Sequence, residues 1–219
     1  MMKKMLIIAW TTFLLGIVFK LLHYPGAGLI LSLGTLLFFV HSIIYLCKNA
    51  KTDLPMSFLH LSYSFLTMYV LFRLQYWFGG PRFLGFPLIF LVSFFVTLTS
   101  LVLLLKSKTK FKFPQIFLLA YFAFFLVLSY IHSDRIYYFF NLNTVLHSDA
   151  RETNYNSWDR YSWFLYIVNK QDEALEANHK AQKIAEEHLK TTQNRMVVFD
   201  LELIKQHEQQ IKDKNWTIP

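Results

Sequence analysis

Five runs of mostly apolar residues follow one another between residues 5 and 132, and residues 133 to 219 are polar and charged. A helix needs about 20 mostly apolar residues to cross a membrane. The runs reach that length at 5–22, 28–47, 56–77, 83–105 and 113–132. We therefore predict an all-α, polytopic membrane protein with about five transmembrane helices, arranged as two hairpin repeats plus one helix.

The change in composition predicts where the domains end. Of the 219 residues, 54% are hydrophobic and 18% aromatic, more than is typical of soluble domains. We predict a transmembrane domain at 1–132, a polar linker at 133–156 and a soluble helical tail at 157–219. The N-terminal run lacks a cleavage site of small residues and is predicted to be a retained helix.

The positive charge of the chain predicts its orientation. The net charge is +8, and eight lysines lie before or between the apolar runs, where such residues set topology rather than bind nucleic acid. The prediction is a bacterial inner-membrane protein with its N-terminus cytoplasmic and its C-terminus extracytoplasmic. The lysines on the cytoplasmic side are Lys3, Lys4, Lys48, Lys51, Lys106, Lys108, Lys110 and Lys112.

An unusual turn joins the first two apolar runs and returns in weaker form between the third and fourth. In each copy an aromatic residue is followed by a cation. A histidine and a tyrosine come next in the first copy, and a tyrosine and a tryptophan in the second, and glycine follows in both. Lys20 and Arg73 hold equivalent places, where a cation either binds an anionic group or extends to the lipid headgroups. The motif residues are Phe19, Lys20, His23, Tyr24 and Gly26 in the first copy, and Phe72, Arg73, Tyr76, Trp77 and Gly79 in the second.

The first hairpin resembles the N-terminal transmembrane hairpin of the GldL-type gliding-motility stator proteins. The resemblance covers about 45 residues and implies a membrane hairpin. Proton-driven motor activity is not expected, because such stators need a carboxylate within the membrane and Asp53 is the only acidic residue before Asp134. The matching residues are Gly16, Phe19, Lys20, His23, Tyr24, Gly26, Ala27 and Gly34.

Two histidines, His41 and His60, lie on neighbouring apolar runs. Paired membrane histidines can ligate haem iron, whereas neutral histidines can also bond to nearby serines. They are weak metal candidates, as is a site formed by His23, His132 and Asp134. The single cysteine, Cys47, excludes an internal disulfide and multi-cysteine zinc sites. No cofactor is predicted.

Helical periodicity returns in the tail, with helices predicted from residue 157, at 173–189 with Asp172 as N-cap, and at 194–212. The order Trp158, Tyr161, Ser162, Leu165, then Ala174, Asn178, Ala181 resembles a single degenerate tetratricopeptide repeat. Asn178, in place of an aromatic residue, and Glu186, in place of proline, depart from that pattern. A generic three-helix tail is the alternative. The aromatic surplus predicts a partner-binding surface at Trp158, Trp163, Phe164 and Tyr166.

No catalytic or phosphate-binding motif is present in the sequence. The leading hypothesis is a non-enzymatic inner-membrane scaffold or accessory protein that contacts the lipid bilayer. Its exported tail would bind an unknown protein partner or a second copy of itself. The alternative is a small transporter or channel subunit that uses the duplicated hairpin interface, and a weaker one is a haem-binding membrane redox protein.

Overall fold

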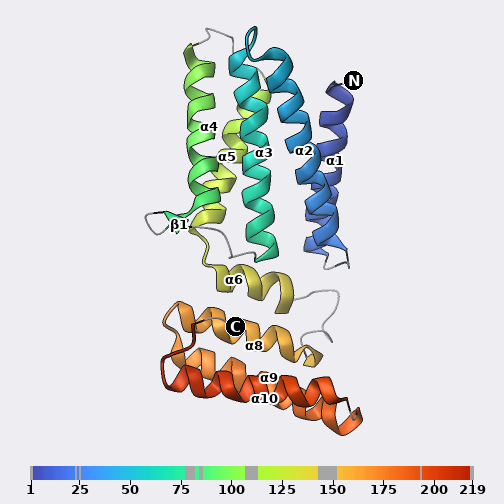
Figure 1. The fold of residues 1–219 in the computed structure, drawn as a ribbon, viewed down its shortest axis with the longest axis vertical. Helices are drawn as coiled ribbons and strands as arrows, with labels where there is room; N and C mark the ends of the chain where they lie inside the picture. Colours follow the sequence, from blue (N-terminus) through green and yellow to red (C-terminus); the bar gives the residue numbers. More distant parts are fainter. Residues whose placement is uncertain are drawn as a thin grey trace. The chain divides into compact units, whose positions relative to one another are not determined.

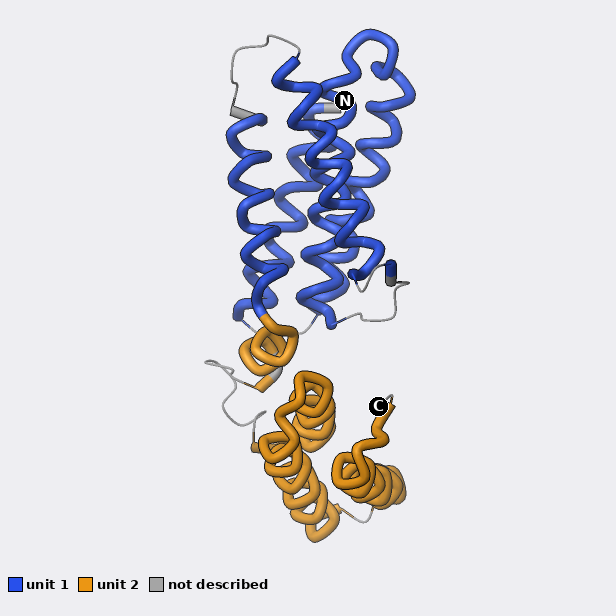
Figure 2. Tube along the Cα trace, turned by 90° about the vertical axis from the view of Figure 1, so that its left-hand side faces the viewer, with its two compact units in different colours: residues 1–131 blue, residues 132–219 orange. Residues whose placement is uncertain are grey.

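The computed structural model describes residues 2–22, 24, 26–76, 82–83, 86–106, 113–142, 152–192 and 194–217. The chain divides into two compact units, residues 1–131 and residues 132–219 (Figure 2). Both are built from helices (Figure 1), which confirms the predicted all-α class. The boundary falls at residue 131, so residues 133–142, which we expected in a polar linker, belong to the second unit.

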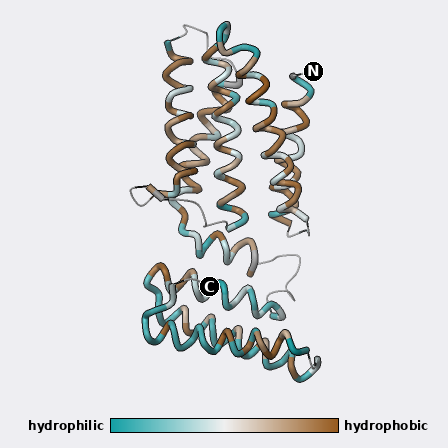
Figure 3. Tube along the Cα trace, viewed as in Figure 1, coloured by the Kyte–Doolittle hydropathy of each residue, from teal (hydrophilic) through white to brown (hydrophobic). Residues whose placement is uncertain are grey.

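The first unit is a bundle of apolar helices (Figure 3). Four of its helices are each long and apolar enough to cross a membrane, and α5 makes a fifth span when it is counted together with the short helix that follows it. The protein is therefore a polytopic membrane protein by length and composition. The helices are α1 (Met2–Leu21), α2 (Ala27–Asn49), α3 (Leu54–Gln75), α4 (Leu88–Lys106) and α5 (Phe113–Tyr130).

Helix α3 is the centre of the first unit, because it packs against α2, α4 and α5. It is also the most buried of the four helices that could each cross a membrane. In its most apolar stretch 61% of the residues are buried, against 33% or less in the other three helices. Small polar side chains bond it to its neighbours, as is common where helices pack in lipid. Ser64 Oγ donates to the Phe38 carbonyl of α2 at 3.0 Å, and Ser93 Oγ of α4 donates to the Phe65 carbonyl at 2.9 Å.

Two glycines allow α1 and α2 to approach closely. A Cβ atom at Gly34 would lie 2.7 Å from the Phe13 nitrogen, and one at Gly16 would lie 2.8 Å from the Leu31 nitrogen. Contacts that short are not tolerated against backbone. The absence of side chains at these two positions therefore sets the spacing of the first hairpin.

The two predicted hairpins differ in the segments that join their helices. Between α1 and α2 the chain reverses within a few residues, and Gly26 takes the left-handed conformation, with φ 82°, at the start of α2. Helix α3 instead ends at Tyr76, which is also left-handed, with φ 57°. Before α4, a two-residue strand β1 (Arg82–Phe83) pairs antiparallel with β2 (Phe86–Pro87). The second turn is thus longer and differently built.

The second unit begins with helix α6 (Ser133–Tyr137), which continues into a π-helical turn, η1 (Tyr138–Leu142). The side chain of Leu142 is fully buried in the core of this unit. Three longer helices follow, at α8 (Tyr155–Ile167), α9 (Gln171–Thr191) and α10 (Arg195–Lys212). They correspond to the three helices that the periodicity of the tail predicts.

The start of α9 differs from the prediction. Lys170, not Asp172, occupies the N-cap position, and its side chain makes no capping bond. Instead the Lys170 Nζ pairs with Glu173 Oε2 at 3.0 Å. Asp172 lies in the first turn of the helix, where a carboxylate still interacts favourably with the helix dipole.

Small residues allow α8 and α9 to pack closely, and their replacement should separate the helices. Ala174, Ala181 and Ser162 are fully buried in the tail. Ala174→Leu adds volume to this contact, so we expect it to lower the unfolding free energy of the tail by about 1–3 kcal/mol. Thermal melts of residues 132–219, followed by circular dichroism, measure the difference. Equal melting of the two forms would contradict the close packing of α8 on α9.

Candidate functional site

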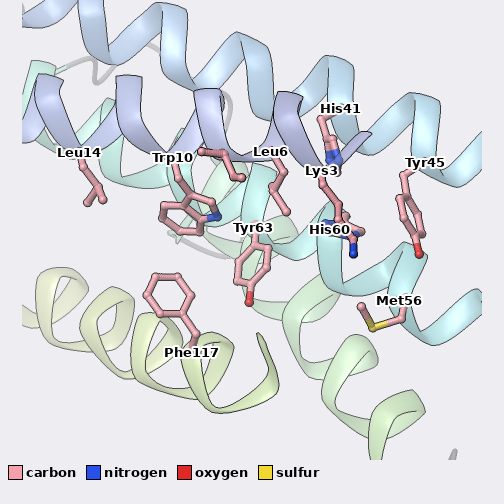
Figure 4. A pocket seen from close by; sticks show the side chains of 11 residues that line it. Lys3, Leu6, Trp10, Leu14, His41, Tyr45, Met56, His60, Tyr63 and Phe117 are labelled. Carbon is pink, nitrogen blue, oxygen red and sulfur yellow. The ribbon is translucent and has the colours of Figure 1, made fainter. Parts of the chain in front are cut away.

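A cavity of about 550 Å³ lies where α1, α2, α3 and α5 of the first unit converge (Figure 4). Most of its lining is apolar, and Lys3 is the lining residue that carries a formal charge. The aliphatic side chains around it include Leu6, Ile7 and Leu14 of α1 and Met56 of α3. More than half of the lining residues carry a ring, and these are Trp10, His41, Tyr45, His60, Tyr63 and Phe117.

Trp10, on the α1 wall of the cavity, contacts the three other helices that form it. Its ring meets Phe38 of α2 at 4.7 Å, Tyr63 of α3 at 5.4 Å and Phe117 of α5 at 4.8 Å between centroids, each edge to face. Edge-to-face pairs of this kind stabilise beyond the area that they bury. The Trp10 ring therefore has contacts to three other helices, which hold it in place on one wall.

The structure brings His41 and His60 together. Their ring centroids lie 4.7 Å apart, edge to face, and Tyr45 lies 4.3 Å from His60. Two rings in direct contact differ from a pair that ligates an iron from opposite sides. Among the described residues, no group of three or more histidine, cysteine or acidic side chains is placed to hold a metal ion.

The serines next to these histidines bond to backbone rather than to the rings. Ser42 Oγ donates to the His60 carbonyl at 2.7 Å and lies 2.5 Å from Ser64 Oγ. The His60 side chain is 7% exposed, and its Nδ1 has no hydrogen-bond partner in the part of the chain that the structure describes. The His60 ring lines the cavity while its Nδ1 atom is enclosed by protein. The sequence alone could not have shown which bonds the serines make.

Lys20 and Arg73, predicted to be equivalent, have different partners. The Arg73 guanidinium donates to the Leu128 carbonyl at 3.1 Å and to the Ile131 carbonyl. It thereby caps the C-terminal end of α5, whose last carbonyls have no partner within the helix. The Lys20 ammonium instead lies 5.6 Å from the centre of the Tyr76 ring. Arg73 has a structural role that simple extension to the headgroups does not account for.

The remaining turn residues are only partly described. Phe19 and Tyr24 contact each other with their centroids 5.5 Å apart, and Tyr24 is 46% exposed. The Phe72 carbonyl accepts the bond from the Tyr76 backbone N–H that ends α3. His23, Trp77 and Gly79 lie outside the described residues, so the metal site suggested for His23 with His132 and Asp134 does too.

The four aromatic residues that we expected on a partner surface of the tail lie in or near its core. Trp158 and Phe164 are 6% and 0% exposed, and Trp163 and Tyr166 are half-buried. Two segments outside the predicted helical hairpin contribute to this burial. Phe164 contacts Tyr137 of α6 at 4.9 Å, and Tyr166 contacts Trp216, beyond α10, at 6.1 Å.

A buried polar network connects the three tail helices. Asp159 of α8 accepts a bond from Asn178 of α9 at 3.1 Å and lies 2.8 Å from His207 Nδ1 of α10. Asn178 also donates to the Ile204 carbonyl at 3.1 Å, and the ring of Trp216 stacks on His207 at 4.4 Å. The asparagine that departs from the tetratricopeptide pattern is therefore a fully buried hydrogen-bonding residue.

The network continues to the surface at Glu208. Hydrogen bonds to this carboxylate, first from Gln182 and then from Lys212 and His179, lower the pKa of Glu208 to about 2. Gln182 Nε2 lies 2.7 Å from Oε2, and His179 Nε2 lies 3.0 Å from Oε1. The ionised form of Glu208 is thus favoured in the folded tail.

The lowered pKa of Glu208 predicts a pH dependence. The carboxyl contributes stability that is fully present above its unfolded pKa of 4.5 and is lost as the pH falls towards about 2. In urea titrations of residues 132–219 across this window, Glu208→Gln is expected to reduce the loss of stability on acidification. Glu202→Gln, an exposed change on the same helix, is the control. Identical pH profiles for wild type and Glu208→Gln would contradict the role of the cluster.

Helix α10 also carries apolar side chains that the tail does not bury. Met196, Phe199 and Leu203 are 66%, 62% and 38% exposed. Their spacing places them along one side of the helix. Val198, next to the buried Val197, is 45% exposed. We call Met196, Phe199 and Leu203 the α10 stripe.

Comparison of the chain with protein-family models, with curated proteins and with solved structures finds no match. The fold itself defines the class, a helical polytopic membrane protein with a helical C-terminal unit. Any assignment of function beyond that class rests on the geometry of the residues described above.

Proposed function

We propose that this protein is a non-enzymatic membrane scaffold whose C-terminal helical unit binds a protein partner. The observation that carries the proposal is the α10 stripe, of which Met196 and Phe199 are the most exposed large apolar side chains that the structure describes in this unit. Exposed apolar surface next to polar groups is typical of protein-binding surfaces. A helix that presents residues i, i+3 and i+7 is suited to packing against a helix or groove of another protein.

The internal order of the tail supports this role. The three helices surround a continuous core, and the network of Asp159, Asn178 and His207 fixes how they pack. A rigid scaffold presents a binding surface without the entropic cost of ordering it. The pair α8 and α9 is proposed to be similar to one tetratricopeptide unit, with α10 covering its face.

The placement of the lysines supports the proposed orientation. Helix α1 begins, α2 ends and α4 ends at the same end of the first unit (Figure 1), where Lys3, Lys48 and Lys106 lie. Helix α5 ends at the opposite end, where Arg73 caps it. Under the positive-inside rule the lysine end is cytoplasmic, and the tail is extracytoplasmic in a bacterial inner membrane.

A site-specific photocrosslinker in the full-length chain tests the proposed surface in intact membranes. We place it at Phe199, within the α10 stripe, and at Gln209, an exposed polar position on the same helix, as the matched control. We expect one discrete protein adduct from Phe199 and none from Gln209. Adding Met196→Glu, next to the crosslinker on the stripe, is expected to abolish that adduct.

The mass of the adduct identifies the kind of partner. An adduct of twice the chain mass means self-association through the tail, and any other discrete mass means a different protein. Equal adducts from the two positions, or crosslinking to lipid alone, would contradict a scaffold that uses the α10 stripe.

A further inference from the structure

We infer that the cavity of the first unit binds a membrane quinone, a lipid-soluble molecule with a flat apolar ring that carries carbonyl or hydroxyl oxygens. This site is separate from the α10 stripe and adds a ligand to the proposed scaffold. The volume of about 550 Å³ lies within the range of small-molecule sites. The lining residues come from helices that are themselves membrane spans, so the ligand is one that partitions into lipid.

The shape and chemistry of the lining favour a ring over a flexible acyl chain. Rings make up more than half of the lining residues, and aromatic walls stack on flat ligands. The contacts of Trp10 with Tyr63 and Phe117 hold two walls of the cavity in fixed positions. Such walls suit a ligand of defined shape.

The two ends of the cavity differ in polarity (Figure 4). His41, His60 and Lys3 lie towards one end, and Trp10 and Leu14 lie towards the other. A molecule with a polar ring and an apolar tail matches this division. The ring would occupy the histidine end, and the tail would leave along the apolar end into the lipid.

The strongest indication is the imidazole of His60. The side chain is more than nine-tenths buried and lines the cavity, and its enclosed Nδ1 atom has no hydrogen-bond partner among the described residues. A ligand oxygen in the cavity would therefore bond to the other ring nitrogen, Nε2. An imidazole nitrogen donates to a quinone carbonyl in one tautomer and accepts from a quinol hydroxyl in the other.

The charge around the cavity excludes one class of ligand. No acidic residue lines it, and Lys3 lies at the polar end. A cationic amphiphile would meet a positive charge there with no carboxylate to balance it. Neutral molecules with electronegative oxygens are compatible with this lining.

Saturation binding of tritiated decylubiquinone to the full chain in phosphatidylcholine nanodiscs tests the inference. We expect saturable binding at one site per chain. His60→Leu removes the hydrogen bond and is expected to weaken binding about tenfold, the effect of one buried bond. Helical content and elution volume establish that this variant is folded.

A second pair of variants tests the cavity without changing His60. Leu14 lines the cavity and is 51% exposed, whereas the adjacent Leu15 is 45% exposed and does not line it. Leu14→Trp is expected to block binding, and Leu15→Trp to leave it unchanged. The same loss in both variants would overturn the inference.

Competition experiments with two further ligands complete the test. Decylubiquinol is expected to compete with the labelled quinone because an imidazole nitrogen can also accept a bond, and the ratio of the two affinities reports the preferred tautomer. Oleate is expected to compete poorly. Equal displacement by oleate, or uptake of label no greater than in empty nanodiscs, would mean that the cavity is only a lipid-filled space.

Discussion

Asp159→Ala is expected to unfold the tail more readily than any single surface change in it. The substitution removes the acceptor that Asn178 and His207 share, and both partners are buried. Each buried polar group left without a partner costs about 1–3 kcal/mol. His207 Nδ1 and one N–H of Asn178 lose their partner, although Asn178 keeps its bond to the Ile204 carbonyl. The loss therefore amounts to a large share of the stability of a small domain.

Urea unfolding of residues 132–219 measures this effect. Asp159→Asn keeps one acceptor oxygen and is expected to lie between wild type and Asp159→Ala. Glu202→Ala, an exposed change on α10, serves as the control. A midpoint for Asp159→Ala equal to that of the control would show that the network does not hold the three helices together.

Gly34→Ala is expected to disrupt the packing of α1 on α2. The added Cβ would lie 2.7 and 2.8 Å from backbone atoms of Phe13, which cannot move aside as the end of a side chain can. Overpacking of this kind costs about 1–3 kcal/mol, which exceeds the gain of up to about 1 kcal/mol from replacing glycine in a helix.

Gly28→Ala is the matched control, because the new Cβ would meet only the end of the flexible Gln75 side chain. Thermal aggregation of the purified full chain, followed by size-exclusion chromatography in one detergent, compares the three proteins. We expect Gly34→Ala to lose its monodisperse peak at a lower temperature than wild type, and Gly28→Ala to retain it. Equal loss in both variants would argue against close packing at Gly34.

The sequence was sufficient to predict the membrane helices because length and hydropathy are local properties. The apolar runs at 5–22, 28–47, 56–77 and 83–105 correspond to α1, α2, α3 and α4 within a few residues. The tail helices were also predictable, since the helical period repeats over each of them. Their exact ends were not, as Lys170 in place of Asp172 at the start of α9 shows.

Features that depend on distant parts of the chain could not be predicted. The sequence placed residues 133–142 in a linker, but contacts such as that of Tyr137 with Phe164 draw this segment into the tail. Asn178 looked like a defect in a repeat, and only the positions of Asp159 and Ile204 show why it is buried.

The candidate sites were also predictable only in part. The pairing of His41 with His60 was anticipated from their places on neighbouring runs, and their rings do meet. The cavity beside them was not, because Trp10 and Phe117 join its lining from helices far away in sequence. The α10 stripe was missed because exposure depends on which side of a helix its neighbours cover.

The proposed partner-binding role depends on the orientation of the chain, because the orientation determines which compartment the tail faces. Reporter fusions that are active on only one side of the membrane, placed after Lys48, Lys108 and Pro219, measure it directly. We predict cytoplasmic activity for the first two fusions and extracytoplasmic activity for the fusion after Pro219. Cytoplasmic activity of the Pro219 fusion would contradict both the five spans and the exported tail.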